Sequence, residues 1–163
     1  MKTLLLMRHA KSSWKQPELQ DFDRPLSKRG FKDAPRMGIL LREVELIPEK
    51  ILASPALRTQ ETAELLTEAT HSKNPIEYIP EFYMGEPETY FLALKELPDE
   101  LERVMVIGHN PGLEGLLQVL SKKVESLPTA AIAYLSLPIK HWQELDEKVE
   151  CDLVELWRPK EIK

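Results

Sequence analysis

The amino-acid sequence predicts a three-layer α/β/α sandwich with a mostly parallel central sheet. Short apolar runs alternate with segments of helical periodicity through most of the chain, as expected of strands joined by crossover helices. The central runs are almost wholly apolar, which is typical of strands buried on both faces. With 163 residues, of which 42% are hydrophobic and 30% charged, we expect a single domain over residues 1–163.

Six short runs predict the strands. The first, "TLLLM", is followed at once by Arg8, so the apolar stretch is too short for the hydrophobic region of a signal peptide and is better explained as a strand. The last two runs are separated by a less helical stretch and are expected to pair through a hairpin or a short crossover. The six runs span residues 3–7, 50–54, 76–79, 103–108, 131–137 and 151–157.

The first predicted helix covers residues 28–44, with Ser27 available as its N-cap. Pro35 and Gly38 inside this segment indicate a bend. The face that we expect to point to the core consists of Phe31, Met37, Leu40, Leu41 and Val44.

Three further helices are predicted, each shortly after a predicted strand. Over residues 54–69, Ser54 can serve as the N-cap and Pro55 suits the first helical position. Residues 87–97 and 111–120 also open with proline and carry leucines at helical spacing. The carboxyl ends of the strands therefore lead into helices.

The net charge of −5 argues against a general nucleic-acid binder. Its distribution is uneven, because residues 1–60 carry a balance of +5 and residues 61–163 a balance of −10. This asymmetry permits a locally positive cleft on an acidic protein, although a chance distribution over the surface explains the counts equally well.

Cys151 is the only cysteine, which excludes an intramolecular disulfide and a cysteine-based zinc site. Because free thiols persist in reducing compartments, we expect a cytoplasmic protein. No run approaches the roughly 18 apolar residues of a membrane span, so we expect no membrane partner.

Cationic and histidine side chains follow three of the predicted strands. Arg8 and His9 come directly after the first strand, and Arg58 lies about one helical turn after the second. His109 follows the fourth strand. Because ligands of open α/β sheets bind outside the carboxyl ends of the strands, we expect these four side chains to meet at one edge of the sheet.

Two arginines and two histidines in one place suit a phosphoryl group. The planar guanidinium of arginine matches phosphate oxygens and stays charged, so Arg8 and Arg58 can hold the phosphate. The amides that open the helix after Asn110 add a further attraction for an anion. A neutral imidazole placed in line can attack phosphorus, and these residues alone leave open whether His9 or His109 does so.

Each of these residues also has a structural explanation, because a single histidine at a strand end is more often structural than catalytic. A metal site at His9 and His109 is disfavoured, since two flanking arginines would repel a divalent cation and the segments supply no carboxylate. We therefore expect neither a metal nor another cofactor. His71 and His141 have no comparable neighbours and are expected at the surface or in packing.

The segments "LMRHA", "ASPALRTQETA" and "VIGHNPG" together resemble the histidine phosphatase superfamily, which includes cofactor-dependent phosphoglycerate mutases and acid phosphatases. "DFDRPLSKRG", "GHNPGLE" and "PTAAIA" are most similar to its small bacterial branch, the phosphohistidine phosphatases. The resemblance extends over nearly the whole chain and implies a phosphoglycerate mutase-like fold. It also implies that His9 is the nucleophile that becomes phosphorylated. Arg8 and Arg58 would bind the phosphate, and His109 would stabilise the transferring group.

The implied activity is the metal-independent removal of phosphate from phosphohistidine in proteins. Many relatives use a carboxylic acid to protonate the leaving group, and Glu81 is the candidate here, with Glu86 as a second choice. Either residue can equally be a solvated loop carboxylate. An imidazole leaving group needs such an acid less than an alkoxide does, so we expect a preference for P–N over P–O substrates.

The polar loop after His9 offers further contacts to the same phosphate, from Lys11 and Ser12, although it can also be a capped surface loop. Asp23 and Arg24 are expected to pin this loop by a salt bridge. Few residues remain for a lid, so we expect an open cleft. An open cleft suits a phosphate presented on a protein surface, although small phosphorylated substrates also fit one.

Three other functions stay open at this level. A general phosphomonoesterase or sugar-phosphate phosphatase would share the fold and act on small phosphate esters. A mutase is disfavoured because the chain is too short for an enclosing lid. An inactive phosphate-binding module would keep the pocket without the chemistry, and the presence of both histidines and both arginines argues against it.

Overall fold

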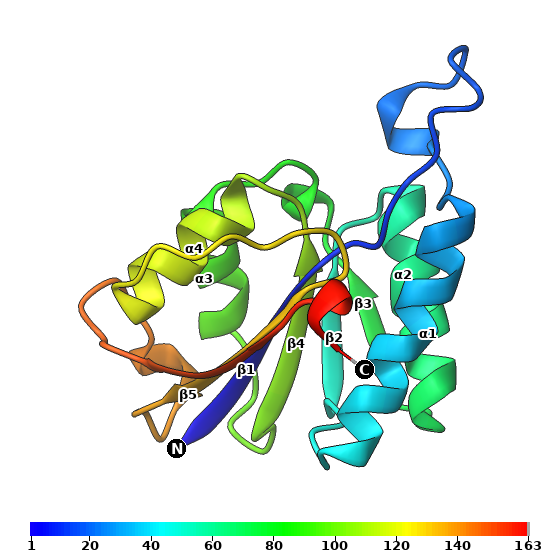
Figure 1. Ribbon diagram of the computed structural model, residues 1–163. Coiled ribbons are helices and arrows are strands. Elements are labelled where there is room, and N and C mark those ends of the chain that lie inside the picture. The colour runs from blue at the N-terminus through cyan, green and yellow to red at the C-terminus, as the bar shows by residue number, and fades with distance from the viewer. Residues whose placement is uncertain (163) are drawn as a thin grey trace.

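The computed structural model describes residues 1–162 and contains a six-stranded sheet with helices on both faces (Figure 1). The order across the sheet is β3-β2-β4-β1-β5-β6. The first four strands in the chain are mutually parallel, β5 is antiparallel to β1, and β6 is antiparallel to β5. The strands are β1 (Lys2–Arg8), β2 (Lys50–Ala53), β3 (Ile76–Tyr78), β4 (Arg103–Gly108), β5 (Ile132–Leu137) and β6 (Asp152–Trp157).

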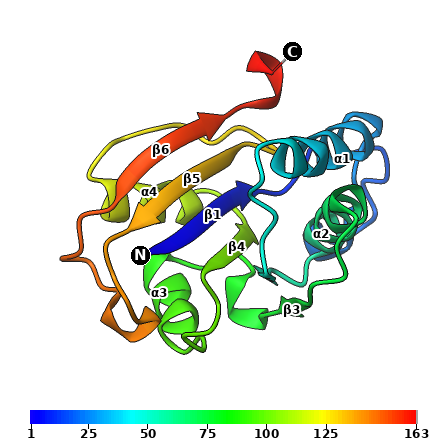
Figure 2. The same cartoon turned by 90° about the horizontal axis from the view of Figure 1, so that it is seen from below.

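The helices form the two outer layers of the predicted sandwich, which the structure confirms (Figure 2). Helices α1 (Lys28–Glu43) and α2 (Leu57–Thr70) pack on one face, and α3 (Pro87–Lys95) and α4 (Gly112–Ser121) on the other. Among residues 1–162, none of the helices combines the length and apolar character needed to cross a bilayer. Four 3₁₀ turns complete the fold: η1 (Asp21–Asp23), η2 (Pro80–Phe82), η3 (Trp142–Glu144) and η4 (Pro159–Glu161).

Strand β1 shows why the apolar runs form the middle of the sheet. Its side chains alternate between the faces, so that Leu4 and Leu6 belong to the core under α3 and α4, while Leu5 and Met7 belong to the core under α1 and α2. All four are fully buried. Burial on both faces holds the strand's carboxyl end, and the residues that follow it, in a fixed position.

Helix α1 agrees with the prediction at its start and differs from it in its buried face. The Ser27 hydroxyl accepts a hydrogen bond from the Gly30 amide at 3.2 Å, which confirms the N-cap. The prediction was wrong for Phe31 and Val44, which are 46% and 39% exposed. The helix turns small residues toward α2 instead: a Cβ on Gly38 would lie 2.5 Å from the Leu66 carbonyl oxygen.

Helix α2 begins two residues later than predicted, at Leu57 instead of Pro55, with Ala56 as its N-cap residue. Ser54 is therefore not the cap, and Pro55 precedes the helix. Ser54 is fully buried, and its hydroxyl lies 2.8 Å from Nε2 of His109. The last two strands pair antiparallel, as a hairpin would, and η3 lies between them.

Candidate active site

The two predicted histidines lie side by side where two neighbouring strands end. Arg8 pairs with Gly108 across β1 and β4, and the His9 amide donates a hydrogen bond to the Gly108 carbonyl at 3.1 Å. Each histidine follows the last residue of its strand. The imidazole centroids of His9 and His109 are 5.1 Å apart, and both residues are buried.

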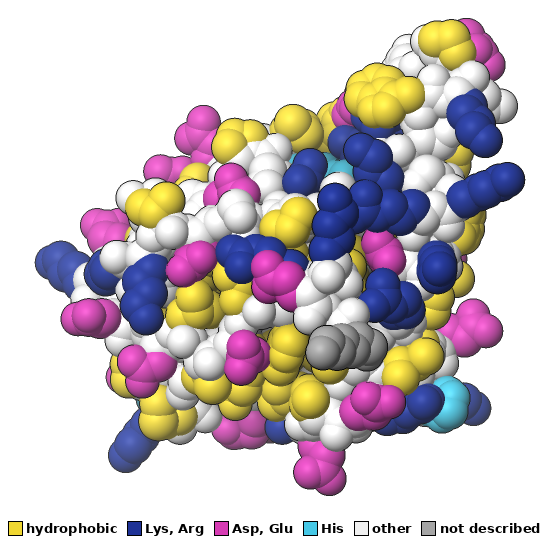
Figure 3. All heavy atoms as spheres, in the orientation of Figure 1, with side chains coloured by type: hydrophobic (Ala, Val, Ile, Leu, Met, Phe, Trp, Pro, Cys, Tyr) yellow, Lys and Arg dark blue, Asp and Glu magenta, His cyan; other side chains and the backbone are white. Residues whose placement is uncertain are grey.

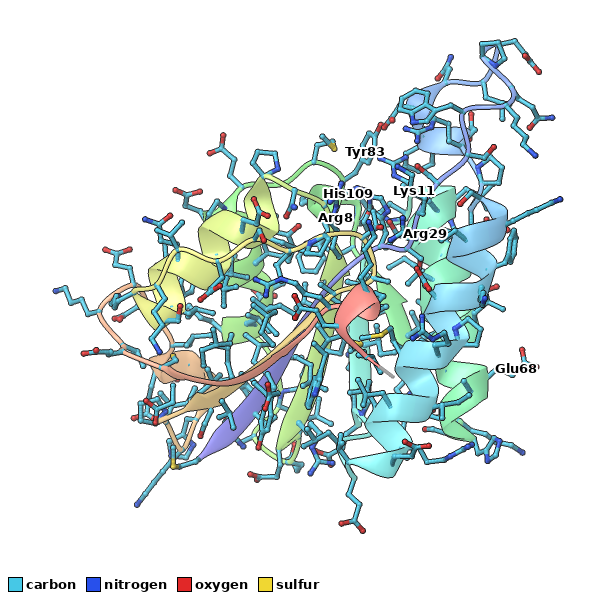
Figure 4. All side chains as sticks on the ribbon, in the orientation of Figure 1. Arg8, Lys11, Arg29, Glu68, Tyr83 and His109 are labelled. Carbon is cyan, nitrogen blue, oxygen red and sulfur yellow. The ribbon has the colours of Figure 1, made fainter. Side chains whose placement is uncertain are left out.

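These histidines form the floor of a cleft of about 210 Å³ at the carboxyl edge of the sheet. The structure brings together here six of the residues proposed from sequence, Arg8, His9, Lys11, Ser12, Arg58 and His109. In Figure 4, Arg8, Lys11 and His109 gather at this edge, and Glu68 lies far away on α2. The cleft is also lined by Trp14, Arg24, Met84, Asn110 and Thr129.

A backbone carbonyl sets the tautomer of His9. Its Nδ1 lies 2.8 Å from the Ala10 carbonyl oxygen, which can only accept a hydrogen bond. Nδ1 therefore carries the proton, and Nε2 keeps its lone pair. This is the form of imidazole that can act as a nucleophile.

His109 takes the opposite tautomer, and side chains determine it. Its Nε2 is 2.8 Å from the hydroxyl of Ser54, and its Nδ1 is 3.4 Å from an Nη atom of Arg58. Because a guanidinium can only donate, Nδ1 accepts and Nε2–H donates to Ser54. Ser54 is thus a site residue that the sequence analysis assigned to a helix cap.

Both imidazoles are neutral at pH 7. Burial, opposed by the Ala10 hydrogen bond and aided by nearby His109 and the arginines, lowers the pKa of His9 to about 3. Burial and the charge of Arg58 lower the pKa of His109 to about 4, although Asp21 acts in the other direction. A dianionic phosphoryl group entering the cleft would favour the protonated form of His109.

Asp21 orients the arginines, a role that the sequence analysis missed. Its carboxylate accepts hydrogen bonds from Arg58 at 3.0 Å, Arg24 at 2.9 Å and the Tyr83 hydroxyl at 2.6 Å. Arg58 also donates to the Asp21 carbonyl at 2.6 Å. Burial raises the pKa of Asp21, but the bonds from Tyr83 and the arginines outweigh it and bring the pKa to about 2.

The predicted salt bridge between Asp23 and Arg24 is replaced by one between Asp21 and Arg24. The η1 turn accounts for this, because it places Asp21 one turn before Arg24. The segment "DFDRP" indicated a salt bridge between an aspartate and Arg24, but the sequence alone did not show which of its two aspartates forms that bridge.

Arg24 ties the loop after β1 to the cleft. It donates hydrogen bonds to the Ser12 hydroxyl and, at 3.2 Å, to the Ser13 carbonyl. Its guanidinium lies 3.3 Å from the centroid of the Trp14 ring, a stacked cation–π contact. Trp14 is 70% exposed and stands at the rim of the cleft.

Arg8 keeps donor capacity for a ligand. One Nη donates to the Leu127 carbonyl at 3.3 Å, and among residues 1–162 its buried Nε has no hydrogen-bond partner. Burial lowers the pKa of Arg8, with Glu114 opposing and Arg58 adding to the effect. An arginine held in this way is prepared to bind an anion.

The structure does not bring Glu81 or Glu86 to the cleft. Glu81 is exposed on η2 and lines a separate pocket of about 450 Å³ beside α3. Within residues 1–162, no aspartate or glutamate lines the cleft of the two histidines. The start of α4 also contributes less than expected, because the Leu113 amide already donates to the His109 carbonyl at 3.0 Å.

The remaining histidines are surface residues, as predicted. The His71 ring lies 2.9 Å from an Nη atom of Arg42, and His141 Nδ1 lies 2.8 Å from Asp99. In the described part of the chain, no group of three or more His, Cys, Asp or Glu side chains is arranged to hold a metal ion.

The sequence matches the model of the histidine phosphatase superfamily (branch 1) over residues 4–127. An uncharacterized chloroplastic protein of Arabidopsis thaliana is 33% identical over 150 residues, covering 86% of this chain and 69% of that protein. An uncharacterized protein of Mycobacterium leprae is 30% identical over 155 residues, covering 86% of this chain and 92% of that protein.

Two solved structures are similar over nearly their full length. One, from Agrobacterium tumefaciens, is a proposed phosphohistidine phosphatase, SixA; its TM-score is 0.83 at 28% identity, over 97% of this chain and 98% of that one. The other is a protein histidine phosphatase SixA complexed with tungstate. Its TM-score is 0.84 at 25% identity, over 99% of both chains.

Proposed function

This chain belongs to the histidine phosphatase superfamily, and we propose that it removes phosphate from phosphohistidine residues of proteins, without a metal, through a phosphorylated His9. The single observation that carries the proposal is the composition of the cleft. It joins a neutral imidazole with a free Nε2 to three arginines, and among the described residues it has no carboxylic acid.

In the first step, Arg8 and Arg58 hold the phosphoryl oxygens while the lone pair of His9 Nε2 attacks phosphorus. A bond forms from Nε2 to phosphorus, and the P–N bond to the substrate imidazole breaks with its electron pair going to the leaving nitrogen. The arginines balance the charge that gathers on the equatorial oxygens. When the dianion is bound, Nδ1 of His109 takes up a proton from solvent, and this Nδ1–H donates a hydrogen bond to one of these oxygens while Nε2–H keeps its bond to Ser54.

In the second step, a water oxygen attacks the phosphorus of phosphorylated His9. The bond from phosphorus to Nε2 breaks, inorganic phosphate leaves, and Nε2 recovers its lone pair. The Nδ1–H bond to the Ala10 carbonyl remains in place through both steps, so the ring is already oriented when each begins.

The lack of a carboxylic acid in the cleft favours P–N substrates. An imidazole leaving group accepts a proton near neutral pH and can take it from water, whereas an alkoxide needs a positioned acid. Asp21 cannot supply the proton at neutral pH, since its pKa of about 2 keeps it ionised.

Two further observations support the proposal. The SixA protein of similar fold was solved with tungstate, a tetrahedral oxyanion like phosphate. The cleft also opens to the surface, since a histidine is visible between lysine and arginine side chains in Figure 3, and this opening suits a phosphate carried on a protein surface. For the location of the chain we propose a reducing compartment such as the cytoplasm, which fits the free, buried thiol of Cys151.

The test is to trap the intermediate. Rapid acid-free quenching after mixing with radiolabelled phosphoimidazole should give base-stable, acid-labile phosphate on the peptide containing His9. Hydrolysis of phosphoimidazole should exceed that of an alkyl phosphate at equal concentration. Similar rates would identify a general phosphomonoesterase, and phosphate binding without any turnover would identify an inactive binding module.

A further inference from the structure

We propose that the substrate carries a second anionic group, which binds in a cationic pocket beside the cleft; this inference rests on the proposed function. The pocket measures about 340 Å³ and lies against the cleft. Arg8, Lys11 and Thr129 line both spaces, so they form a shared wall. The far side is formed by Arg29, Arg158 and Lys160.

The pocket is cationic although the chain has a net charge of −5. Five of its lining residues are lysine or arginine and one, Glu161, is acidic. Figure 3 shows lysine and arginine side chains gathered on this face of the molecule, and Figure 4 places Arg29 next to Lys11 and Arg8. Like charges that converge in this way repel one another, and an anion between them relieves the repulsion.

Carboxylates neutralise only part of this charge. Arg29 is 3.3 Å from Asp33, and Arg158 is 3.3 Å from Glu125 and 3.8 Å from Glu161. Among residues 1–162, no carboxylate lies within ion-pair distance of the ammonium group of Lys11 or of Lys160. In the described part of the chain, Lys11 on the near side and Lys160 on the far side therefore have no carboxylate partner, and the same is true of Arg8 in the shared wall.

The backbone of Lys11 is fixed against the start of α1. Its carbonyl accepts hydrogen bonds from the Ser27 amide at 2.8 Å and the Ser27 hydroxyl at 2.9 Å. The close approach depends on Gly30, because a Cβ there would lie 2.2 Å from the Lys11 carbonyl oxygen. These contacts fix the position of the Lys11 backbone in the shared wall.

Lys160 lies near the other end of the chain, in the η4 turn, which is held against the same helix α1. The buried carboxylate of Asp33 pairs with Arg36 at 3.2 Å as well as with Arg29. Arg36 in turn donates hydrogen bonds to the Pro159 carbonyl at 3.4 Å and the Ile162 carbonyl at 3.3 Å. One buried acid thus positions both Arg29 and the η4 turn that carries Lys160.

The shared wall determines what the pocket can bind. A molecule whose phosphoryl group lies between Arg8 and Arg58 presents its neighbouring groups to Lys11 and then to the pocket. Lysine and arginine recognise carboxylates and phosphates. The second group is therefore a carboxylate, as on an acidic side chain near the phosphohistidine, or a second phosphate.

The test uses ligands that cannot be hydrolysed. Titration calorimetry of the whole protein would compare methylphosphonate with phosphonates that carry a terminal carboxylate on tethers of one to six methylenes, and with their uncharged amides. At least one carboxylate should bind about fivefold more tightly than its amide, with a gain that falls at high salt. An equivalent series that ends in a second phosphonate distinguishes a carboxylate from a second phosphate. The series with the larger gain in affinity identifies the second anionic group.

The variant Arg29→Gln/Lys160→Gln should lose this gain and keep its affinity for methylphosphonate. The matched control is Lys32→Gln/Lys148→Gln, which removes the same charge from exposed positions outside the pocket and should keep the gain.

A gain that survives in the first variant, or falls equally in both, overturns the proposal. Methylphosphonate binding with no gain at any tether also overturns it and leaves the proposed function intact. Absence of methylphosphonate binding overturns both. A normal gain in a protein that forms no phosphorylated His9 overturns only the proposed function.

Discussion

The two strand ends that carry His9 and His109 look alike in sequence and differ in how they hold their imidazoles. His9 donates from Nδ1 to a backbone carbonyl, whereas His109 donates from Nε2 to the Ser54 hydroxyl and accepts from Arg58. The tautomer of the first ring is thus set by the main chain, and that of the second by two side chains. In the proposed mechanism, the attacking ring thus has a lone pair fixed by the main chain, and the ring that gains a proton beside the bound anion has a tautomer that a side-chain substitution can alter.

The largest expected effect separates the two histidines by rate. His9→Ala should reduce kcat on phosphoimidazole by about 10⁴-fold or more, because it removes the atom that forms the covalent bond. His109→Ala should cost about 10²- to 10³-fold, as expected of a group that only stabilises charge. Steady-state kinetics of both variants, with circular dichroism as the control for folding, measures the difference. Equal losses would remove the distinction between the rings.

The next largest effect comes from both histidines together and concerns the free energy of unfolding. An unfolded histidine binds a proton below about pH 6.5, whereas the folded protein holds His9 and His109 neutral down to about pH 3 and 4. Unfolding therefore takes up protons, and the free energy of unfolding should fall by about 2 kcal/mol per histidine between pH 7 and pH 5. Asp21 does not contribute in this window, since its carboxyl group is ionised above pH 5 both in the folded protein, where its pKa is about 2, and in the unfolded chain, where the pKa is about 3.9. Urea titrations should show the loss, and His9→Gln/His109→Gln should be nearly flat over the same range.

Asp21→Asn tests whether the arginines beside His109 depend on the carboxylate of Asp21 for their orientation. Arg58 and Arg24 would keep a neutral partner and lose the charge that orients them, so kcat/KM should fall about tenfold. Asp23→Asn is the matched control, because this exposed neighbour forms no ion pair with Arg58 or Arg24, and it should leave kcat/KM unchanged. A similar loss in both variants would mean that the lower kcat/KM comes from the change in net charge and not from the loss of the ion pairs of Asp21 with Arg58 and Arg24.

The smallest effect should come from Ser54→Ala, which removes the acceptor of the His109 Nε2–H bond. We expect a three- to tenfold loss in kcat and about 1 kcal/mol of stability, the usual contribution of one buried hydrogen bond. Nitrogen-15 spectra should show the His109 tautomer shifting while that of His9 stays fixed. Ser121→Ala, another buried serine far from the cleft, controls for the loss of a hydroxyl. A shift in the His9 spectrum would contradict the independence of the two rings.

Sequence patterns predicted the elements of the fold well because burial on both faces of the sheet leaves a direct mark on composition. They were less accurate on helix faces. Phe31 and Val44 have the right spacing for a core position, but α1 approaches α2 through Gly38, and this close packing is not visible as hydrophobicity. Helix starts were similarly ambiguous, since Ser54 has the character of a cap and is instead occupied with His109.

In the site, the residues at strand ends could be placed from sequence because topology alone brings such ends together. Asp21 and Tyr83 could not, because Asp21 reaches Arg58, and Tyr83 reaches Asp21, from loops far apart in the chain. The cationic pocket was missed for the same reason. Lys160 and Arg158 approach Lys11 only because the chain returns to α1 after β6.

The stacked pair of Trp14 and Arg24 gives the molecule an optical reporter of its own. Trp142 is fully buried, and Trp157 is stacked on Tyr134, so only Trp14 offers an exposed indole at the mouth of the cleft. An oxyanion that binds in the cleft and attracts Arg24 moves the guanidinium away from its stacked position on the Trp14 indole. Occupancy can therefore be followed as emission intensity in the unlabelled protein, with iodide quenching to separate the signal of Trp14 from that of the other two.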